Sequence, residues 1–170
     1  MNLKLETHLS KSEVFEAVKN YLKENGFKII NSDETRPWGG FFVIDEKQSQ
    51  KFVAFFFNGT EDAYNEEQKI SPKILIVEPG KRLSWQYHYR RAELWKVIGG
   101  KVGVVQSEND KETEVKTKKI NDLIKLKQGE RHRLIGLETW GIVAEIWQHA
   151  DYLQPSDEND IVRLQDDFGR

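Results

Sequence analysis

The chain has 170 residues, a formal net charge of -2 at pH 7 and no cysteine. This charge gives no electrostatic basis for binding nucleic acid, and the absence of thiols excludes disulfides and thiolate metal sites. No apolar run approaches the roughly 18 residues that a membrane span requires, and residues 1–14 lack the apolar stretch of a signal peptide. We therefore expect a cytoplasmic protein that binds neither nucleic acid nor membrane.

The predicted elements are one helix followed by many strands. Apolar residues recur at helical spacing from Ser12 to Asn25, with Ser10 or Ser12 as the N-cap and Gly26 as the terminator. From Phe27 onward, short β-rich runs are separated by turn residues. These runs are 41–45, 51–57, 73–78, 82–88, 93–98, 101–106, 113–118, 122–126, 132–137 and 140–147. This spacing predicts an all-β sandwich or barrel.

Two segments have a less regular pattern. Residues 61–69 are polar and predict either a short helix or a loop. The tail from residue 151 to the C-terminus is polar, and we expect it to be irregular or briefly helical.

A cluster of polar residues interrupts the aromatic run from Trp85 to Trp95. Gln86 and His88 are two residues apart, so they share one face of a strand, and a turn lets Glu93 return on the next strand. His132 follows a glycine turn and reaches the same place from a distant strand. Two imidazoles, a carboxylate and an amide oxygen suit a divalent metal such as zinc, and iron or manganese also fit.

These residues stand in a pattern that resembles a known family. The spacing of the two blocks resembles the paired motifs of the cupin superfamily, with Gln86 where most cupins have a second histidine. The closer resemblance is to the isomerase domain of type II mannose-6-phosphate isomerases. The segments that carry it are 36–44, 77–102, 128–134 and 160–170. Three departures are Lys127, Gly136 and Trp147, where the family has proline, asparagine and glutamine.

The resemblance implies a fold and a domain plan. We expect a single cupin barrel, that is, a double-stranded β-helix or jelly roll, over residues 36–170. Residues 1–35 are expected to add an N-terminal helix and strand extension.

The resemblance also implies a reaction. It is the interconversion of mannose 6-phosphate and fructose 6-phosphate through an enediol, with a divalent metal, zinc first, held by Gln86, His88, Glu93 and His132. The expected substrate contacts are Arg163, Arg91 and Lys96, and the expected catalytic residues are Arg163, Glu145 and His149. Each has a simpler interpretation: Arg163 could pair with Asp166 or Asp167 to hold the tail, and Glu145 and His149 could be a salt-bridged strand end and a surface histidine.

Two other functions remain open. One is a metal cupin enzyme that acts on another sugar phosphate, and the other is a cupin that binds sugar without turnover. The sequence has no glycine-rich nucleotide loop, so we do not expect nucleotidyl transfer by this chain. The expected partner is a small phosphosugar, with a homodimer expected by analogy to other cupins.

Overall fold

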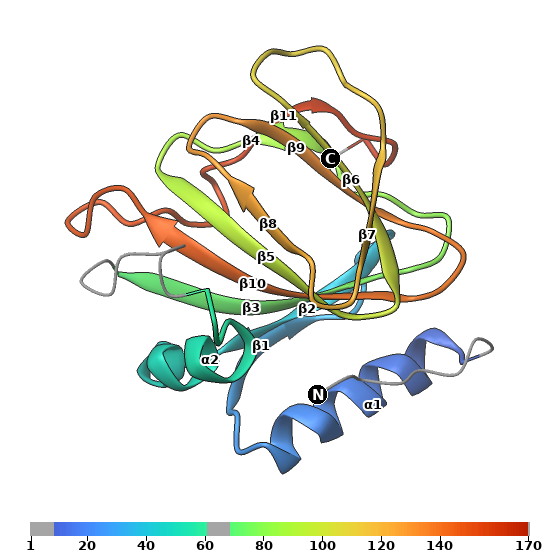
Figure 1. Cartoon of the computed structure of the whole chain (residues 1–170), viewed down its shortest axis with the longest axis vertical. Coiled ribbons are helices and arrows are strands. Elements are labelled where there is room, and N and C mark those ends of the chain that lie inside the picture. The colour runs from blue at the N-terminus through green and yellow to red at the C-terminus, as the bar shows by residue number, and fades with distance from the viewer. Residues whose placement is uncertain (1–8, 61–68, 170) are drawn as a thin grey trace.

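The computed structural model describes residues 9–60 and 69–169, and within them it has two β-sheets with a helical layer on one side (Figure 1). Helix α1 (Lys11–Glu24) and helix α2 (Ser49–Phe56), which follows a short 3-10 turn (Glu46–Gln48), lie against one sheet. No described helix is both long enough and apolar enough to cross a membrane.

The strands form one six-stranded and one five-stranded antiparallel sheet. In spatial order the first sheet is β1 (Ile29–Asp33), β2 (Gly39–Ile44), β3 (Ile70–Val77), β10 (Gly141–His149), β5 (Arg91–Gly99) and β8 (Leu123–Leu126). The second is β11 (Val162–Gln165), β4 (Trp85–Tyr87), β9 (Arg131–Gly136), β6 (Lys101–Ser107) and β7 (Lys116–Lys119). The predicted all-β cupin barrel with an N-terminal helix is confirmed. The boundary at residue 35 stays a prediction.

Two hydrophobic cores cover the two faces of the six-stranded sheet. One core lies between the sheets and includes Leu75, Trp95 and Leu134. The other lies between the first sheet and the helices and includes Phe15 and Phe52. Because successive side chains of a strand point to opposite faces, each central strand contributes to both cores. On β5, residues 91, 93 and 95 therefore face the barrel interior, whereas Leu94 faces the helices.

The predicted N-terminal helix is confirmed to within one residue at each end. Ser10 is the N-cap, and its hydroxyl and the Glu13 carboxylate form a reciprocal capping box. Gly26 follows the helix with φ of +71°, a conformation that glycine adopts without steric cost.

Two predictions about secondary structure are wrong. Residues 51–57, expected as a strand, fall mostly within helix α2, where Phe52, Val53 and Phe56 form its buried face. A short aromatic run has no strict period, so it fits a buried helix as well as a strand. The tail contains β11, which pairs with β4 in the register Arg163 to Gln86. A polar segment can do this because an edge strand needs only backbone hydrogen bonds. Residues 61–68 lie outside the described residues.

Candidate metal centre and cavity

Three strands of the barrel bring the predicted ligands together. Gln86 lies on β4 directly opposite His132 on β9, and His88 follows the end of β4. The chain then turns into β5, which carries Glu93. The carboxylate of Asp160 orders this turn by accepting from the backbone N–H groups of Tyr89 and Arg90 at 3.0 and 2.9 Å.

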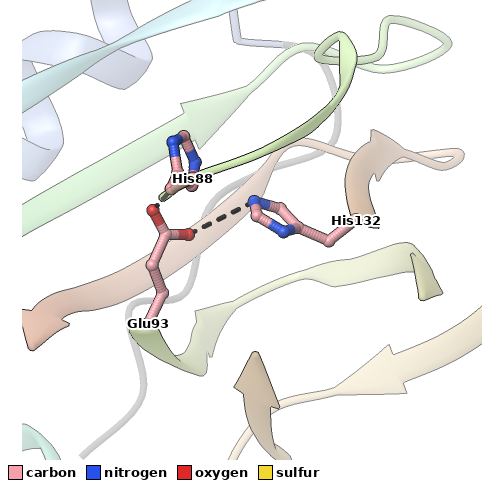
Figure 2. A group of neighbouring side chains, drawn as sticks. All are labelled: His88, Glu93 and His132. Atoms are coloured by element: carbon pink, nitrogen blue, oxygen red, sulfur yellow. Dashed lines mark ion pairs between the residues drawn. The ribbon is translucent and has the colours of Figure 1, made fainter. Parts of the chain in front are cut away.

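The Glu93 carboxylate lies between the two imidazoles, with one oxygen toward each ring (Figure 2). Glu93 Oε1 is 3.3 Å from His88 Nε2, and Glu93 Oε2 is 3.4 Å from His132 Nε2. One ligand atom from each residue lies within 4.8 Å of the others. All three side chains are 2% exposed. This is a compact N/O cluster from which bulk water is excluded.

Backbone carbonyls fix the tautomer of both imidazoles. His88 Nδ1 is 2.5 Å from the carbonyl oxygen of Asp160, and His132 Nδ1 is 2.9 Å from that of Glu130. A carbonyl can only accept, so each Nδ1 carries the proton and each Nε2 presents its lone pair to the cluster. Metal-bound histidines are commonly oriented by such second contacts.

The electrostatics favour the protonation states that a metal requires. Burial lowers the pKa of His88 to about 4, against the attraction of Glu93, and burial also lowers the pKa of His132. Burial alone would raise the pKa of Glu93, but the charges of His88, Arg91 and His132 together lower it to about 2. At neutral pH the cluster is thus two neutral imidazoles and one carboxylate.

Two atoms of the cluster present buried lone pairs that a bound cation would satisfy. In the described part of the chain, Glu93 Oε2 and His132 Nε2 are buried without a hydrogen-bond partner. Because both present lone pairs across 3.4 Å, their contact is repulsive unless a positive charge lies near them. The residues present therefore fit a divalent metal.

Gln86 needs one adjustment to serve as a fourth ligand. Its Oε1 accepts from the Ser84 hydroxyl at 2.5 Å, and its Nε2 lies 3.4 Å from His88 Nε2. Half a turn of the amide exchanges these two atoms, and the Ser84 oxygen can then accept from Nε2. The amide oxygen would then face His88 and the cluster.

Arg91 supplies a positive charge inside the cluster. Its Nε donates to Glu93 Oε1 at 2.7 Å, and its Nη2 lies 3.1 Å from His88 Nε2. The guanidinium is also held by the hydroxyl of Ser156 at 2.7 Å, and the residue is 5% exposed. Arg91, predicted as a substrate contact, is thus in the cavity but bonded to two of the predicted ligands.

Glu93 of the cluster and the adjacent Gln86 form part of the wall of a cavity that is partly open to solvent. Glu145, on β10, lines this cavity with Gln86, Arg91, Glu93 and Arg163. The Glu145 carboxylate accepts from Trp95 Nε1 at 2.9 Å. Burial, with a smaller contribution from the charge of Glu93, raises the pKa of Glu145 to about 8.

The structure does not bring two of the predicted site residues to the cavity. Lys96 lies three residues after Glu93 on β5, so its side chain points to the opposite face of the sheet. His149 lies two residues beyond Trp147 but does not line the cavity. Its ring is held by the Ser71 hydroxyl at 2.8 Å and the backbone N–H of Ser156 at 2.9 Å, which indicates a structural role.

Arg163, which was predicted to contact the substrate, lines the cavity and is exposed on β11. The tail that carries it is held by other pairs: Arg82 binds Asp167 through two hydrogen bonds of 2.6 and 2.8 Å, and Arg133 donates to Gln165. The structure thus offers a means of fixing the tail that does not require Arg163.

Sequence reasoning missed several residues of this site. Lys73 and Trp147 line the cavity, and Asp160 holds His88 through its carbonyl oxygen. Asp160 begins the tail segment that resembles the isomerase family, so that segment was a usable signal. Lys73 gave no signal, because one lysine near the start of an apolar strand also fits a solvated strand end.

Comparison with known proteins gives a family. A family model described as "Mannose-6-phosphate isomerase C-terminal" matches residues 54–166. The xanthan biosynthesis protein XanB of Xanthomonas campestris pv. campestris is 33% identical over 112 residues, which is 66% of this chain and 22% of the relative. A mannose-1-phosphate guanylyltransferase of Salmonella montevideo is 29% identical over 163 residues, 93% of this chain and 28% of the relative. The chain thus spans roughly a fifth to a quarter of these relatives.

Solved structures share the fold at low sequence identity. A Bacillus subtilis oxalate decarboxylase superposes with a TM-score of 0.56 at 14% identity, covering 79% of this chain and 30% of the other. A tomato vicilin gives a TM-score of 0.51 at 15% identity, covering 77% and 32%. The match over residues 54–166 shows that the chain belongs to the mannose-6-phosphate isomerase C-terminal family, and its barrel has a cupin fold.

Proposed function

We propose that the protein is a metal-dependent aldose–ketose isomerase that interconverts mannose 6-phosphate and fructose 6-phosphate. The observation that supports it most is that Glu93 of the buried His88–Glu93–His132 cluster lines the same cavity as the carboxyl group of Glu145. The family match and the mannose-phosphate names of the relatives support the choice of sugar.

The predicted ligands have separate roles in this proposal. His88, Glu93 and His132 would hold the metal, with Gln86 as a fourth ligand, and zinc suits this N/O set. A bound divalent metal supplies Lewis-acid stabilisation of negative charge on the sugar oxygens. Asp160 and Glu130 orient the imidazoles, and Arg91 balances the charge of Glu93.

Glu145 is the group we assign to proton transfer. The isomerisation removes a proton from one carbon and delivers a proton to the adjacent carbon, and a single group that acts first as base and then as acid can serve both steps. A carboxyl group with a pKa of about 8 exists in both forms near neutral pH. The hydrogen bond from Trp95 holds the Glu145 carboxylate in one orientation toward the cavity.

The phosphate of the substrate requires positive charge at the cavity. Arg163 and Arg36 line it from the tail and from the segment before β2. We assign Arg163 to the phosphate, because a guanidinium can donate two parallel hydrogen bonds to its oxygens.

The metal assignment predicts the effect of histidine substitutions. His88→Ala or His132→Ala should weaken zinc binding by at least about 100-fold, since each removes a ligand from a buried site. Competition with a chromophoric chelator and elemental analysis measure this. His149→Ala is the matched control, because His149 is equally buried but lies outside the cluster, and it should keep its metal. Full zinc affinity in both ligand variants would contradict the assignment.

The role of Glu145 predicts a loss of turnover without loss of metal. Glu145→Gln keeps the shape of the side chain but cannot take a proton, so kcat/KM should fall by at least about 100-fold. In the wild type, kcat/KM should rise with pH as Glu145 ionises. The midpoint should lie below 8, because a divalent cation in the cluster favours the carboxylate. Glu138→Gln is the control, because Glu138 is exposed and does not line the cavity. A Glu145→Gln enzyme with wild-type kcat/KM would refute this role.

The reaction itself predicts exchange with solvent. With mannose 6-phosphate in deuterated water, the fructose 6-phosphate formed should carry deuterium next to its carbonyl carbon, because the base exchanges its proton with water. Nuclear magnetic resonance detects this label, and a chelator should abolish turnover. Zinc binding with no isomerisation of any hexose phosphate would instead indicate a sugar-binding cupin, and turnover of a different hexose phosphate would indicate another isomerase.

A further inference from the structure

Lys73 places a buried positive charge in the wall of the cavity. It lies on β3, its side chain is 7% exposed, and it faces the barrel interior. Its Nζ is 3.5 Å from the centre of the Trp147 ring and 5.0 Å from that of Phe41. Aromatic faces stabilise an ammonium group only in part, so a cation this buried also needs an anion.

The anion that Lys73 meets comes from the segment that leads into β11. Glu158 Oε1 contacts Lys73 Nζ in a close ion pair, and the Glu158 side chain is 62% exposed. Glu158 lines the same cavity as Arg163 and Glu145. An exposed carboxylate thus reaches from outside the barrel into the cavity to satisfy an interior lysine.

Two other charged groups of the cavity have hydrogen-bond partners of their own. Glu145 is the residue directly opposite Lys73 in the strand register, but its carboxylate accepts from Trp95. Arg91 binds Glu93, and its guanidinium carbon lies 3.6 Å from the centre of the Trp147 ring. Both cations therefore contact one indole, and Lys73 has Glu158 as its carboxylate.

We infer that Lys73 is a second contact for the phosphate of the substrate, in addition to Arg163 in the same cavity wall, and that Glu158 occupies this Lys73 subsite until the phosphate displaces it. The inference rests on the proposed function for the presence of a phosphate. A phosphate dianion has more charge and more acceptor oxygens than a carboxylate, so it is the stronger partner for a buried ammonium group. The Glu158 side chain is already 62% exposed to solvent, so moving it away from Lys73 costs little.

Glu158 also supplies Lys73 with an ion-pair partner when the cavity holds no sugar. A buried ammonium group is costly without such a partner, and aromatic faces offset this only in part. The pair with Glu158 therefore keeps a subsite of the right sign ready for the substrate. The cost is competition, since each phosphate that binds must break the Lys73–Glu158 pair.

The test measures binding of inorganic phosphate and of mannose 6-phosphate to the purified full chain by calorimetry. Glu158→Gln should tighten phosphate binding about fivefold, the factor that a partly exposed ion pair is worth. Glu108→Gln is the matched control, because it removes an exposed carboxylate that pairs with Lys127 at 3.9 Å, and it should change nothing. Lys73→Met should weaken phosphate binding by at least about tenfold.

The double variant separates competition from general charge effects. In a Lys73→Met background, Glu158→Gln should give no gain, because the two residues act on one subsite. Equal phosphate affinity in Glu158→Gln and wild type, or a gain that persists without Lys73, would overturn the inference. Phosphate bound elsewhere, for example at a metal, would survive Lys73→Met and would also overturn it. If Lys73→Met fails to fold, the comparison of Glu158→Gln with Glu108→Gln still decides.

Failure of this inference is distinct from failure of the proposed reaction, because binding is measured without turnover. Phosphate affinities that follow Lys73 and Glu158, with no isomerisation of any hexose phosphate, would keep the subsite and remove the isomerase. Isomerisation of a hexose phosphate, with a phosphate affinity that does not change in Glu158→Gln, would keep the isomerase and remove the subsite.

Discussion

The arrangement of the site depends on one constraint, which is that lone pairs from the buried side chains of His88, Glu93 and His132 converge on one another. The barrel imposes it, because the three residues come from the end of β4, from β5 and from β9. The carbonyls of Asp160 and Glu130 take the Nδ1 protons and leave both Nε2 atoms without one. Such an arrangement is unfavourable alone and favourable around a cation.

The same environment puts two cavity carboxyl groups into opposite states. The positive charge of Arg91, which donates to Glu93, helps to keep this buried carboxylate ionised, as a metal ligand must be. Glu145 is also buried, and there burial together with the charge of Glu93 outweighs the opposing charges of Lys73 and Arg91 and favours the protonated form. Groups whose environments separate their pKa values in this way are suited to different roles, here ligand and proton carrier. The tail contributes to both halves of the cavity, through Asp160 at the cluster and Glu158 at Lys73.

The sequence predicted the part of the site that is local in the chain. Gln86, His88 and Glu93 lie within eight residues of one another, and strand geometry alone puts the first two on one face. The same rule could have excluded Lys96, which is an odd number of residues from Glu93. Lys73 and its partner Glu158 were not predictable, because their contact joins β3 to the tail across the whole barrel. Helix α2 was missed because its aromatic residues suit either element, and only packing against the sheet decides between them.

The most direct test of the account is anomalous diffraction from crystals grown with zinc. The account predicts one strong peak per chain, about 2.0–2.2 Å from His88 Nε2, His132 Nε2 and a Glu93 oxygen, with the Arg91 guanidinium moved away from His88. The Gln86 amide should present its oxygen to the peak. A peak bound elsewhere on the chain, with Arg91 still bonded to both Glu93 and His88, would contradict the metal centre on which the proposed reaction depends.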